Sequence, residues 1–453
     1  MKTCLSDNYF VATTFLHTQS RRKIKQNRIG TTLALGRPVN AAAAPFRAAM
    51  NQPTQLTWRE FSMSPSLETP TAVPPSARMI SRLAPPMPPR DANGGDTSFM
   101  NNVPDPLLAD KELPTFKFAL ERSVGKIIGN SEGKEVTVEE LPISKGIAGV
   151  SMRLEPGAMR EMHWHATAAE WAFVVEGRVR TTVIDPQGNS ETNDFEPGDV
   201  WFFPRGHGHM LECLGNEPCH FVLIFDNGYF SEFGTFSVTD WLGHVPKALL
   251  AKNLGVDESQ LADYPTSEVY FARGAVPPEV AQAPLHGTQQ PPLTHKYRML
   301  AEPPHGVFAG GQEWRVDSTN FPISKTMAGV ILDLRPGALR ELHWHPTADE
   351  WQYVVEGKVS VTLFGSHGRF RTEILEAGDV GYIPQGYGHS IENIGDGDAR
   401  LLIGFNSGVY ASIGLSQWLA GNPKDVLATN FSQPADSFDD IPHEEVFVAA
   451  ETR

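Results

Sequence analysis

Apolar and polar residues alternate along many short stretches of this chain. GVSMRLEPG, AFVVEGRVRTTVID, DVWFFPRG and HFVLIFD follow a period of two and are rich in valine, phenylalanine and isoleucine, which is the pattern of half-buried strands. The turn signals EPGA, DPQGN, EPGD and PRGHG separate them. Many short antiparallel strands joined by glycine-rich turns predict an all-β jelly-roll sandwich or barrel.

The same pattern returns in the second half of the chain. The segment ISKGIAGVSMRLEPGAMREMHWH begins at Ile143, and ISKTMAGVILDLRPGALRELHWH begins 180 residues later at Ile323, with 15 of 23 positions identical. The offset holds without a gap as far as Phe225, which aligns with Phe405. The chain is therefore an internal duplication of one strand-rich unit.

Each copy is followed by a stretch with helical periodicity. TDWLGHVPKALLAKNLG in the first copy corresponds to SQWLAGNPKDVLATNF in the second. We expect Thr239 or Asp240 to cap the first helix. Its apolar positions are Trp241, Leu242, Val245, Leu249 and Leu250. These helices present more apolar surface than one domain needs, which predicts packing between subunits in a homo-oligomer.

The patterns divide the chain into three parts. Residues 1–110 are expected to form a disordered or targeting N-terminal segment and a proline-rich linker, residues 111–285 the first domain, and residues 286–453 the second. Residues 1–60 hold nine Lys/Arg and two Asp/Glu, a net charge of +7. The remaining residues must carry a net charge of −22, because the whole chain has −15. SRRKIKQ is similar to a twin-arginine export signal, but Gly36 and Pro38 interrupt the apolar stretch that should follow.

Composition narrows the partners of the protein. The net negative charge beyond residue 60 disfavours nucleic acid as a partner, because phosphates would be repelled. The chain contains no apolar run of about 18 residues, so no membrane span is predicted. We expect a soluble protein, with a cytoplasmic location favoured and an exported form as the alternative. Three cysteines, Cys4, Cys213 and Cys219, do not make a disulfide framework. Cys213 and Cys219 flank a turn, and whether they pair stays open.

One cluster of residues in the first copy has the spacing of a metal site. His163 and His165 lie two apart on a predicted strand, so both imidazoles face one side while Trp164 faces the other. Glu170 follows His165 by five positions, and His209 follows it by 44. Three imidazole nitrogens and one carboxylate oxygen can therefore converge on one ion.

The second copy repeats this set as His343, His345, Glu350 and His389. Histidines inside a β-domain often serve only as hydrogen-bonding core residues, but eight candidates in register in two copies favour metal binding. Three nitrogens and one oxygen differ from closed structural zinc sites, and on an octahedral ion they leave two positions for substrate, water or dioxygen. Ligand chemistry alone leaves manganese, iron, nickel, copper and zinc open.

The doubled pattern HWHxxxxEW…G…PGDVWFFPRGHGH resembles the bicupin branch of the cupin superfamily and, more narrowly, the oxalate decarboxylase family. The resemblance covers roughly residues 110 to 450 and includes the RExHWH lead-in, the DSTNF segment and the WL helices. It implies two tandem cupin jelly-roll β-barrels with short C-terminal helices, Mn(2+) in each, and trimers or hexamers. It also implies that oxalate is split into formate and carbon dioxide, with dioxygen required but not consumed overall.

Arg160 and Arg340 occupy the same place in the two copies, three residues before the first histidine. A guanidinium can hold one carboxylate of oxalate by paired, charge-assisted hydrogen bonds. Three residues is an odd separation on a strand, so this role requires a bend near the start of the strand. A solvated surface arginine is the alternative, and the repetition favours substrate binding.

The copies differ in length where FDNGYFSEFGTFSVTDW aligns with FNSGVYASIGLSQW, because Trp241 aligns with Trp418 at an offset of 177. The extra residues of the first copy include Ser231 and Glu232, which match the Ser-Glu pair of the flexible lid in the resembled family. Glu232 is therefore the predicted general acid that protonates the carbon left when carbon dioxide departs. An ordinary exposed loop acid is the alternative.

Two departures from the family pattern affect the prediction. Phe233 and Gly234 follow the lid glutamate where family lids usually carry small polar residues, which leaves the balance between decarboxylation and oxidation open. Gly404 stands where some members have a glutamate near the second metal. The second site is therefore expected to be structural, electronic or weakly active, with the chemistry at the first.

Several functions remain open on the sequence alone. The first is a manganese-dependent oxalate decarboxylase. The second is an oxalate oxidase, which would produce hydrogen peroxide from the same metal and arginine without needing a well-placed acid. The third is a metal-binding bicupin without catalysis, against which the two intact ligand sets count. An iron-dependent dioxygenase or isomerase is disfavoured by the duplicated arginine and the lid glutamate.

Overall fold

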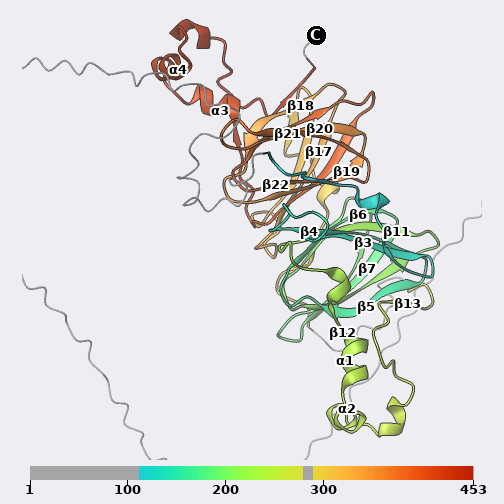
Figure 1. Ribbon diagram of the computed structural model, residues 1–453. Coiled ribbons are helices and arrows are strands. Elements are labelled where there is room, and N and C mark those ends of the chain that lie inside the picture. The colour runs from blue at the N-terminus through green and yellow to red at the C-terminus, as the bar shows by residue number, and fades with distance from the viewer. Residues whose placement is uncertain (1–111, 279–288, 452–453) are drawn as a thin grey trace, which may run out of the picture. The chain divides into compact units, whose positions relative to one another are not determined.

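The structure is a computed structural model that describes residues 112–278 and 289–451. The expectations for the basic N-terminus and the proline-rich linker fall on residues outside these ranges. The described residues form one two-sheet β-sandwich from each half of the duplication (Figure 1). The predicted all-β jelly-roll fold is thereby confirmed, with the refinement that each domain is a sandwich of two separate sheets rather than a closed barrel.

The first half contains a seven-stranded and a six-stranded antiparallel sheet. The larger has the order β14-β9-β6-β11-β4-β3-β2, and the smaller has the order β12-β5-β10-β7-β8 with β13 also paired to β5. The strands are β2 (Lys126–Ile128), β3 (Ser131–Val136), β4 (Ala148–Leu154), β5 (Ala158–Trp164), β6 (Glu170–Glu176), β7 (Arg178–Ile184), β8 (Ser190–Phe195), β9 (Val200–Phe203), β10 (Gly208–Leu214), β11 (Cys219–Phe225), β12 (Phe236–Ser237) and β13 (Phe271–Arg273).

The second half repeats this arrangement. Its sheets have the orders β1-β22-β19-β24-β17-β16-β15 and β21-β20-β23-β18-β25, with β26 on β18. The strands are β15 (Gly306–Phe308), β16 (Gly311–Val316), β17 (Ala328–Leu334), β18 (Leu339–Trp344), β19 (Glu350–Glu356), β20 (Lys358–Phe364), β21 (Phe370–Glu376), β22 (Val380–Ile383), β23 (Gly388–Asn393), β24 (Ala399–Phe405), β25 (Ile413–Gly414) and β26 (Val448–Ala449).

The two halves exchange edge strands. β1 (Lys117–Phe118) precedes the first sandwich in the chain but pairs with β22 of the second. β14 (Lys296–Tyr297) precedes the second sandwich but pairs with β9 of the first. Each exchange covers an otherwise open sheet edge with a strand from the other half, which joins the two halves through backbone hydrogen bonds.

The outer faces of the two large sheets also pack on each other through a symmetric pair of contacts. Trp171 and Trp351 are fully buried in a core that both halves share. A Cβ added to Gly149 would lie 2.1 Å from the indole of Trp351, and one added to Gly329 would lie 2.2 Å from that of Trp171. The two glycines, 180 residues apart, therefore each provide the space for the tryptophan of the opposite half.

The C-terminal extension of each half is two short helices rather than the expected single one. The chain leaves the helical conformation at Val245, because the proline that follows it disfavours the helical region for the preceding residue. The cap is Ser237, whose hydroxyl accepts a hydrogen bond of 3.2 Å from the Asp240 amide, so the predicted cap was wrong. The helices are α1 (Val238–His244), α2 (Lys247–Leu254), α3 (Leu415–Ala420) and α4 (Lys424–Phe431).

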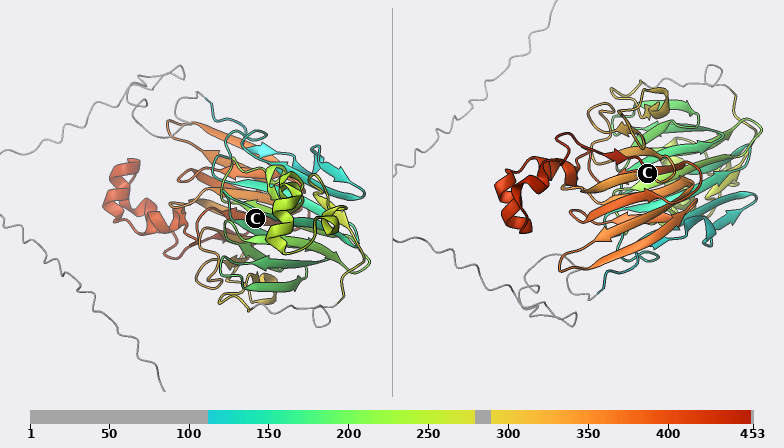
Figure 2. Two further views of the ribbon diagram at one scale, coloured as in Figure 1. Left: turned by 90° about the horizontal axis from the view of Figure 1, so that it is seen from below. Right: turned by 90° about the horizontal axis from the view of Figure 1, so that it is seen from above.

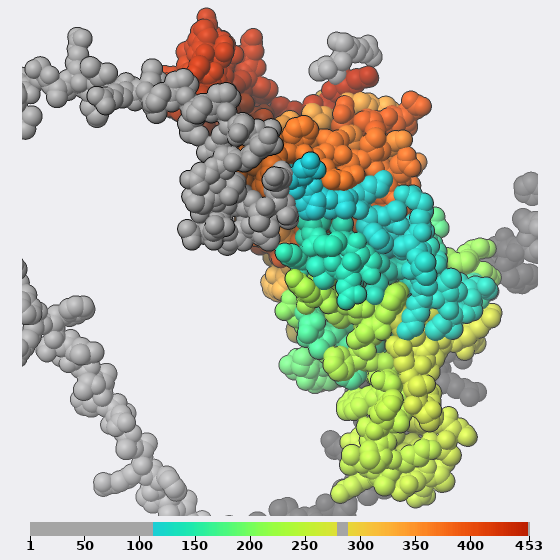
Figure 3. Space-filling model, in the orientation of Figure 1, coloured from blue at the N-terminus to red at the C-terminus, as the bar shows by residue number. Residues whose placement is uncertain are grey.

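These helices project from the sheets, to which α1 and α3 remain attached because Trp241 packs on Trp164 and Trp418 packs on Trp344. The α3–α4 pair lies outside the second sandwich in both views of Figure 2, and the α1–α2 pair forms a knob on the first in Figure 3. Trp241 is 60% exposed and Trp418 is 56% exposed, so the helices carry large apolar side chains on their surfaces. Within the described ranges, no helix is long and apolar enough to span a membrane. Cys213 and Cys219 are buried free thiols.

We expect Gly149→Ala to lower the free energy of unfolding, because the new methyl group would overlap the Trp351 ring. Overpacking of this kind costs about 1–3 kcal/mol. Gly329→Ala should behave in the same way. Gly397→Ala is the control, since a Cβ there meets nothing within 4 Å. Urea unfolding of the three variants measures the effect, and equal stability of all three would contradict the docking role of the two glycines.

Candidate metal centres and active site

The four predicted ligands of the first half meet inside the first sandwich. His163 lies on β5 directly opposite His209 on β10, His165 follows the end of β5, and Glu170 begins β6. One candidate ligand atom from each of the four side chains lies within 4.8 Å of the others, and all four residues are buried. The structure thus brings together side chains that are up to 46 positions apart in the chain.

Backbone carbonyls orient two of these imidazole rings. His163 Nδ1 donates to the Glu161 carbonyl at 2.6 Å, and His209 Nδ1 donates to the His207 carbonyl at 2.9 Å. A carbonyl can only accept, so each Nδ1 carries the proton and each Nε2 keeps its lone pair. Burial, followed by the nearby charge of Arg160, holds the pKa of His163 well below its usual value, which keeps this ring neutral.

The remaining lone pairs of the cluster suit a divalent cation. The buried atoms without a hydrogen-bond partner include His163 Nε2, His165 Nε2, His209 Nε2 and Glu170 Oε2. Buried polar atoms are rarely left unsatisfied, and a divalent metal would satisfy all four at once. The residues present therefore fit a metal ion with three nitrogen ligands and one oxygen ligand.

The second sandwich holds an equivalent cluster. The candidate ligand atoms of His343, His345, Glu350 and His389 also lie within 4.8 Å of one another, and all are buried. Backbone carbonyls again accept from the Nδ1 atoms, at distances of 2.7, 2.7 and 3.1 Å for the three histidines in that order. Each half therefore contains one metal-binding His/Glu group.

The two halves hold the glutamate of the cluster by different means. In the first half, Trp201 Nε1 donates to Glu170 Oε1 at 2.6 Å. In the second half, Gln352 Nε2 donates to Glu350 Oε1 at 2.6 Å. The counterpart of Trp201 is Gly381, where a Cβ would lie only 2.7 Å from the Gln352 side-chain oxygen. Sequence analysis missed both donors, because neither is repeated at the 180-residue offset.

A β-bulge places the arginine beside the histidines. On β10 the partners of β5 are His209 and Leu211, two residues apart, and they face His163 and Arg160, which are three apart. The extra residue on β5 turns Arg160 onto the face that His163 occupies. β18 has the same bulge between Arg340 and the histidine that follows it. The predicted bend of the strand is therefore a bulge that both halves share.

Arg160 is fully buried and held on several sides. Its Nε donates to Glu232 Oε1 at 2.8 Å, and its Nη2 donates to Thr235 Oγ1 at 2.6 Å. Its Cζ lies 3.9 Å from the centre of the Tyr270 ring. Arg340 likewise stacks on Phe447 at 3.7 Å, but its Nη2 has no hydrogen-bond partner. The chain pattern gave no signal for Thr235 or Tyr270.

Glu161, the residue that follows Arg160 in the bulge, holds neighbouring segments against β5. The Glu161 carboxylate accepts hydrogen bonds from the amides of Tyr270 at 2.7 Å and Val269 at 3.1 Å, and from the Thr239 hydroxyl. It thereby fastens β13 and the start of α1 to β5. The repeated RE pair in both copies was a sequence signal for this residue, whose counterpart Glu341 accepts from the Phe447 amide at 3.0 Å.

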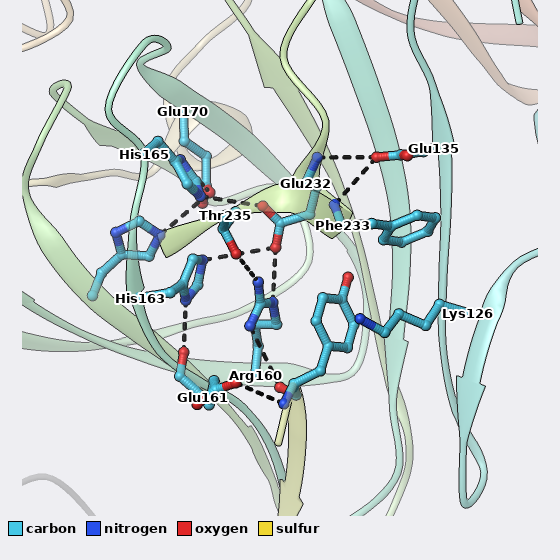
Figure 4. Close-up of polar contacts among 12 residues, drawn as sticks. Lys126, Glu135, Arg160, Glu161, His163, His165, Glu170, Glu232, Phe233 and Thr235 are labelled. Carbon is cyan, nitrogen blue, oxygen red and sulfur yellow. Dashed lines mark hydrogen bonds and ion pairs between the residues drawn. The ribbon is translucent and has the colours of Figure 1, made fainter. Parts of the chain in front are cut away.

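The loop that differs in length covers the first cluster with Glu232. This residue begins the 3-10 helix η3 (Glu232–Gly234) and is 1% exposed, so it is not an ordinary surface acid. Its Oε2 lies 3.2 Å from His165 Nε2, and its Oε1 lies 3.7 Å from His163 Nε2 (Figure 4). Burial by itself raises the pKa of Glu232, but the charge of Arg160 and the adjacent His165 imidazole outweigh burial and lower the pKa to about 2.

The extra residues of the first half coincide with this short helix. Phe230 packs against His165 at a ring distance of 4.8 Å, as Tyr410 packs against His345 at 5.6 Å. The 180-residue offset therefore continues to Phe230. β12 and β25, which follow, are offset by 177 residues, so the three added residues lie between them, where η3 is found.

The structure corrects one position in the second half. Gly404 does not face the second cluster, since a Cβ there would lie 2.6 Å from Ile224 of the first half. Ile403 and Phe405 of β24 line the small cavity at the second cluster, and so does Tyr410 from the loop that follows this strand. The prediction that position 404 lies beside the second cluster was therefore wrong, because Gly404 faces the first half.

Comparisons with known proteins agree with this architecture. A family model described as Cupin matches residues 125–262 and 299–434. The chain is 40% identical over 333 residues to oxalate decarboxylase OxdC of Bacillus subtilis, covering 73% of this chain and 86% of that protein. It is 32% identical over 360 residues to an oxalate decarboxylase of Arthroderma benhamiae, covering 74% of this chain and 84% of the fungal protein.

Solved structures show the same likeness. A structure of Bacillus subtilis oxalate decarboxylase, described for its Mn(II) centres, matches with a TM-score of 0.72 at 40% identity, over 75% of this chain and 90% of the other. Two cupin matches in tandem, with relatives matched over most of their length, establish the kinship that the two clusters suggested. The chain is a member of the bicupin oxalate decarboxylase family of the cupin superfamily.

Proposed function

We propose that this chain is a manganese-dependent oxalate decarboxylase that releases formate and carbon dioxide at the first cluster. The observation that carries the proposal is an asymmetry between otherwise equivalent sites. Both halves have a metal-binding His/Glu group and a buried arginine. Within the described residues, a buried lid glutamate joined to that arginine occurs in the first half alone.

His163, His165, Glu170 and His209 would hold one Mn(2+), and the second quartet would hold another. Nitrogen and carboxylate ligands suit manganese among several divalent metals, and a solved relative is described as containing Mn(II) centres. Bound manganese supplies Lewis-acid polarisation and a means of passing single electrons, and dioxygen is the proposed co-catalyst. The second site, with no lid acid, is proposed to be structural, electronic or weakly active.

Arg160 is the proposed anchor of the substrate. In the closed lid its guanidinium is paired with Glu232 at 2.8 Å, and both side chains are fully buried. An incoming oxalate carboxylate offers the same charge and the same paired acceptor geometry. Substrate can therefore take the place of Glu232 on Arg160, which exchanges one buried ion pair for another without leaving an uncompensated charge. Arg340 is the corresponding proposed anion-binding residue of the second site.

The exchange changes the protonation of Glu232. Pairing with Arg160 is the chief influence that keeps this buried carboxyl ionised, and burial favours the neutral form. Once oxalate occupies the arginine, Glu232 can take up the proton of a singly protonated oxalate. It can then return that proton to the carbon that remains when carbon dioxide departs. One hydrogen oxalate ion thus gives one formate ion and one carbon dioxide, with no proton gained or lost.

The apolar helices support a homo-oligomer, proposed to be a trimer or hexamer. Trp241 and Trp418 are each more than half exposed on the α1–α2 and α3–α4 pairs, and contiguous apolar surface of this kind marks protein interfaces. The mass of the native particle in light scattering tests this proposal, and a monomer would contradict it.

We expect two manganese ions per chain in protein produced with manganese. His163→Ala and His343→Ala should each remove one ion, because three remaining ligands bind far more weakly than four. His163→Ala should abolish formate release, whereas His343→Ala should retain most of it per folded chain. Metal analysis with product analysis makes the comparison. Full activity in His163→Ala would place the chemistry elsewhere.

Glu232→Ala should keep both metals and lower formate release by about 10²- to 10⁴-fold, the usual contribution of a general acid. Glu232→Gln should lose as much, since the amide cannot carry the proton even though it fills the same space. Formate and hydrogen peroxide are measured together on each variant. Formate release near the wild-type rate would show the assignment to be wrong, and peroxide as the main wild-type product would favour the oxidase.

Arg160→Lys should lower kcat/KM for oxalate by about 10- to 100-fold, the range expected when one hydrogen bond to a charged group is lost. Arg340→Lys is the matched control, since it makes the same change at the same place in the second site. Steady-state kinetics should show less than about a threefold effect there. Equal effects of the two substitutions would contradict the placement of substrate at the first site.

A further inference from the structure

The lid is held from behind by a carboxylate on β3. Glu135 Oε1 accepts a hydrogen bond of 2.9 Å from the Ser231 hydroxyl, and its Oε2 lies 3.0 Å from the same hydroxyl. Glu135 Oε2 also accepts from the backbone amides of Glu232 at 2.9 Å and Phe233 at 3.4 Å (Figure 4). One side chain thus contacts three successive lid residues on the face opposite the metal cluster.

A second contact of the lid lies two residues earlier on the same strand. Phe233 packs at the edge of the buried core of the first half. A Cβ added to Gly133 would lie 3.4 Å from the Phe233 ring and 3.2 Å from the Tyr270 hydroxyl. The Phe233 ring of the lid therefore packs directly over Gly133. Gly133 and Glu135 face the lid together because residues two apart on a strand share a face.

The second half has different residues at both positions. Glu313 stands at the place of Gly133, and Arg315 at that of Glu135. Arg315 binds Glu313 at 3.0 Å and stacks on Tyr410 of the short loop at 3.9 Å. A carboxylate that accepts from lid amides therefore accompanies the longer loop and its glutamate, and an arginine accompanies the loop that lacks them.

We propose that Glu135 is a positioning residue that latches the lid at residues 231–233 and so sets the Glu232 carboxylate on Arg160 and the histidines. The proposal rests on the proposed role of Glu232. Glu135 accepts hydrogen bonds from the Glu232 and Phe233 amides and from the Ser231 hydroxyl, which fix the segment that carries Glu232. The Phe233 ring, packed over Gly133, holds the residue that follows it. Release of the latch frees Glu232 to leave the arginine and opens the pocket.

The latch is sensitive to pH because Glu135 is half-buried and lies among other acids. Burial raises the pKa of Glu135 to about 7, against bonds from Ser231 and Phe233 that lower it, and the carboxylates of Glu232 and Glu140 add to the rise. The other titratable group facing it is Tyr270, over whose ring the Lys126 ammonium lies at 3.7 Å.

Closure of the lid is therefore favoured in acid. When the lid is open, Glu135 faces water and titrates nearer its usual value of 4.5. The closed state therefore binds the proton of Glu135 more tightly than the open state does. The resulting stabilisation of the closed lid is complete below pH 4.5 and is lost as the pH rises through about 7. The closing equilibrium should fall by about 10²-fold between pH 4.5 and 7. A proton on Oε1 would face Ser231 and leave Oε2 free to accept from the lid amides.

Two substitutions separate the parts of this latch. Glu135→Gln is a permanently neutral copy, in which the amide oxygen can accept from the lid amides and the NH₂ can donate to Ser231. Glu135→Ala has no latch. Glu132→Gln is the control, because Glu132 lies on the same strand but pairs with Lys134 at 3.4 Å.

Hydrogen exchange of the Glu232 and Phe233 amides in the metal-loaded protein measures the latch directly. After correction for intrinsic rates, wild type and Glu132→Gln should lose protection by about 10²-fold between pH 5 and 8. Glu135→Gln should stay protected throughout, and Glu135→Ala should be unprotected throughout. Formate release should follow the same order, with a larger peroxide fraction when the lid is open.

Wild-type protection that does not change with pH, or Glu135→Gln that keeps the wild-type pH dependence, would overturn the proposal. If Glu135→Ala does not fold, the wild-type pH series and Glu135→Gln still decide it. A protein that binds metal but releases no formate would overturn the proposed function instead, and the exchange of the two amides would still test the latch. The two failures are therefore distinguishable.

Discussion

Each half of the molecule is organised around four buried donor atoms that face one another. Without a cation, three imidazole lone pairs and a carboxylate in a dry core repel each other and lack partners. Several elements of the fold together place these donor atoms. In the first half, β5 and β10 bring two histidines opposite each other, β6 supplies the glutamate, and backbone carbonyls set two of the tautomers. The proposed function depends on this cost being offset by a bound metal.

Duplication supplied two such centres, and the structure shows how they diverged. The shared features are the β-bulge, the aromatic residue under each arginine and the glycine–tryptophan pair that docks the halves. The unshared features surround the clusters. Trp201 in one half and Gln352 in the other hold the ligand glutamate. Divergence in the surroundings allows one metal geometry to serve two roles, because the surroundings decide what can reach the metal and which groups carry protons.

The ion pair between Arg160 and Glu232 connects the lid to the proposed chemistry. A buried guanidinium with no anion would be costly, and in the closed lid the Glu232 carboxylate supplies that anion. Glu135 lies on the other side of the same loop and holds its backbone. The lid is thus attached at one end of Glu232 by its amide and at the other by its carboxylate. In the proposed function, substrate competes only for the second attachment.

The sequence by itself determined the duplicated jelly-roll architecture, the two ligand quartets, the paired arginines and the lid glutamate. The architecture, the quartets and the arginines repeat at a constant offset, and such a repeat can be read from a linear chain. The lid glutamate was found instead where the two copies differ in length and where the resembled family carries a Ser-Glu pair. The tertiary structure alone decided which side chains support them. Trp201, Gln352, Tyr270 and Glu135 reach their partners across loops and sheets, at separations with no period. The helix break at Val245, the cap at Ser237 and the orientation of Gly404 likewise depended on local backbone geometry and on packing between the halves, which no pattern of residues records.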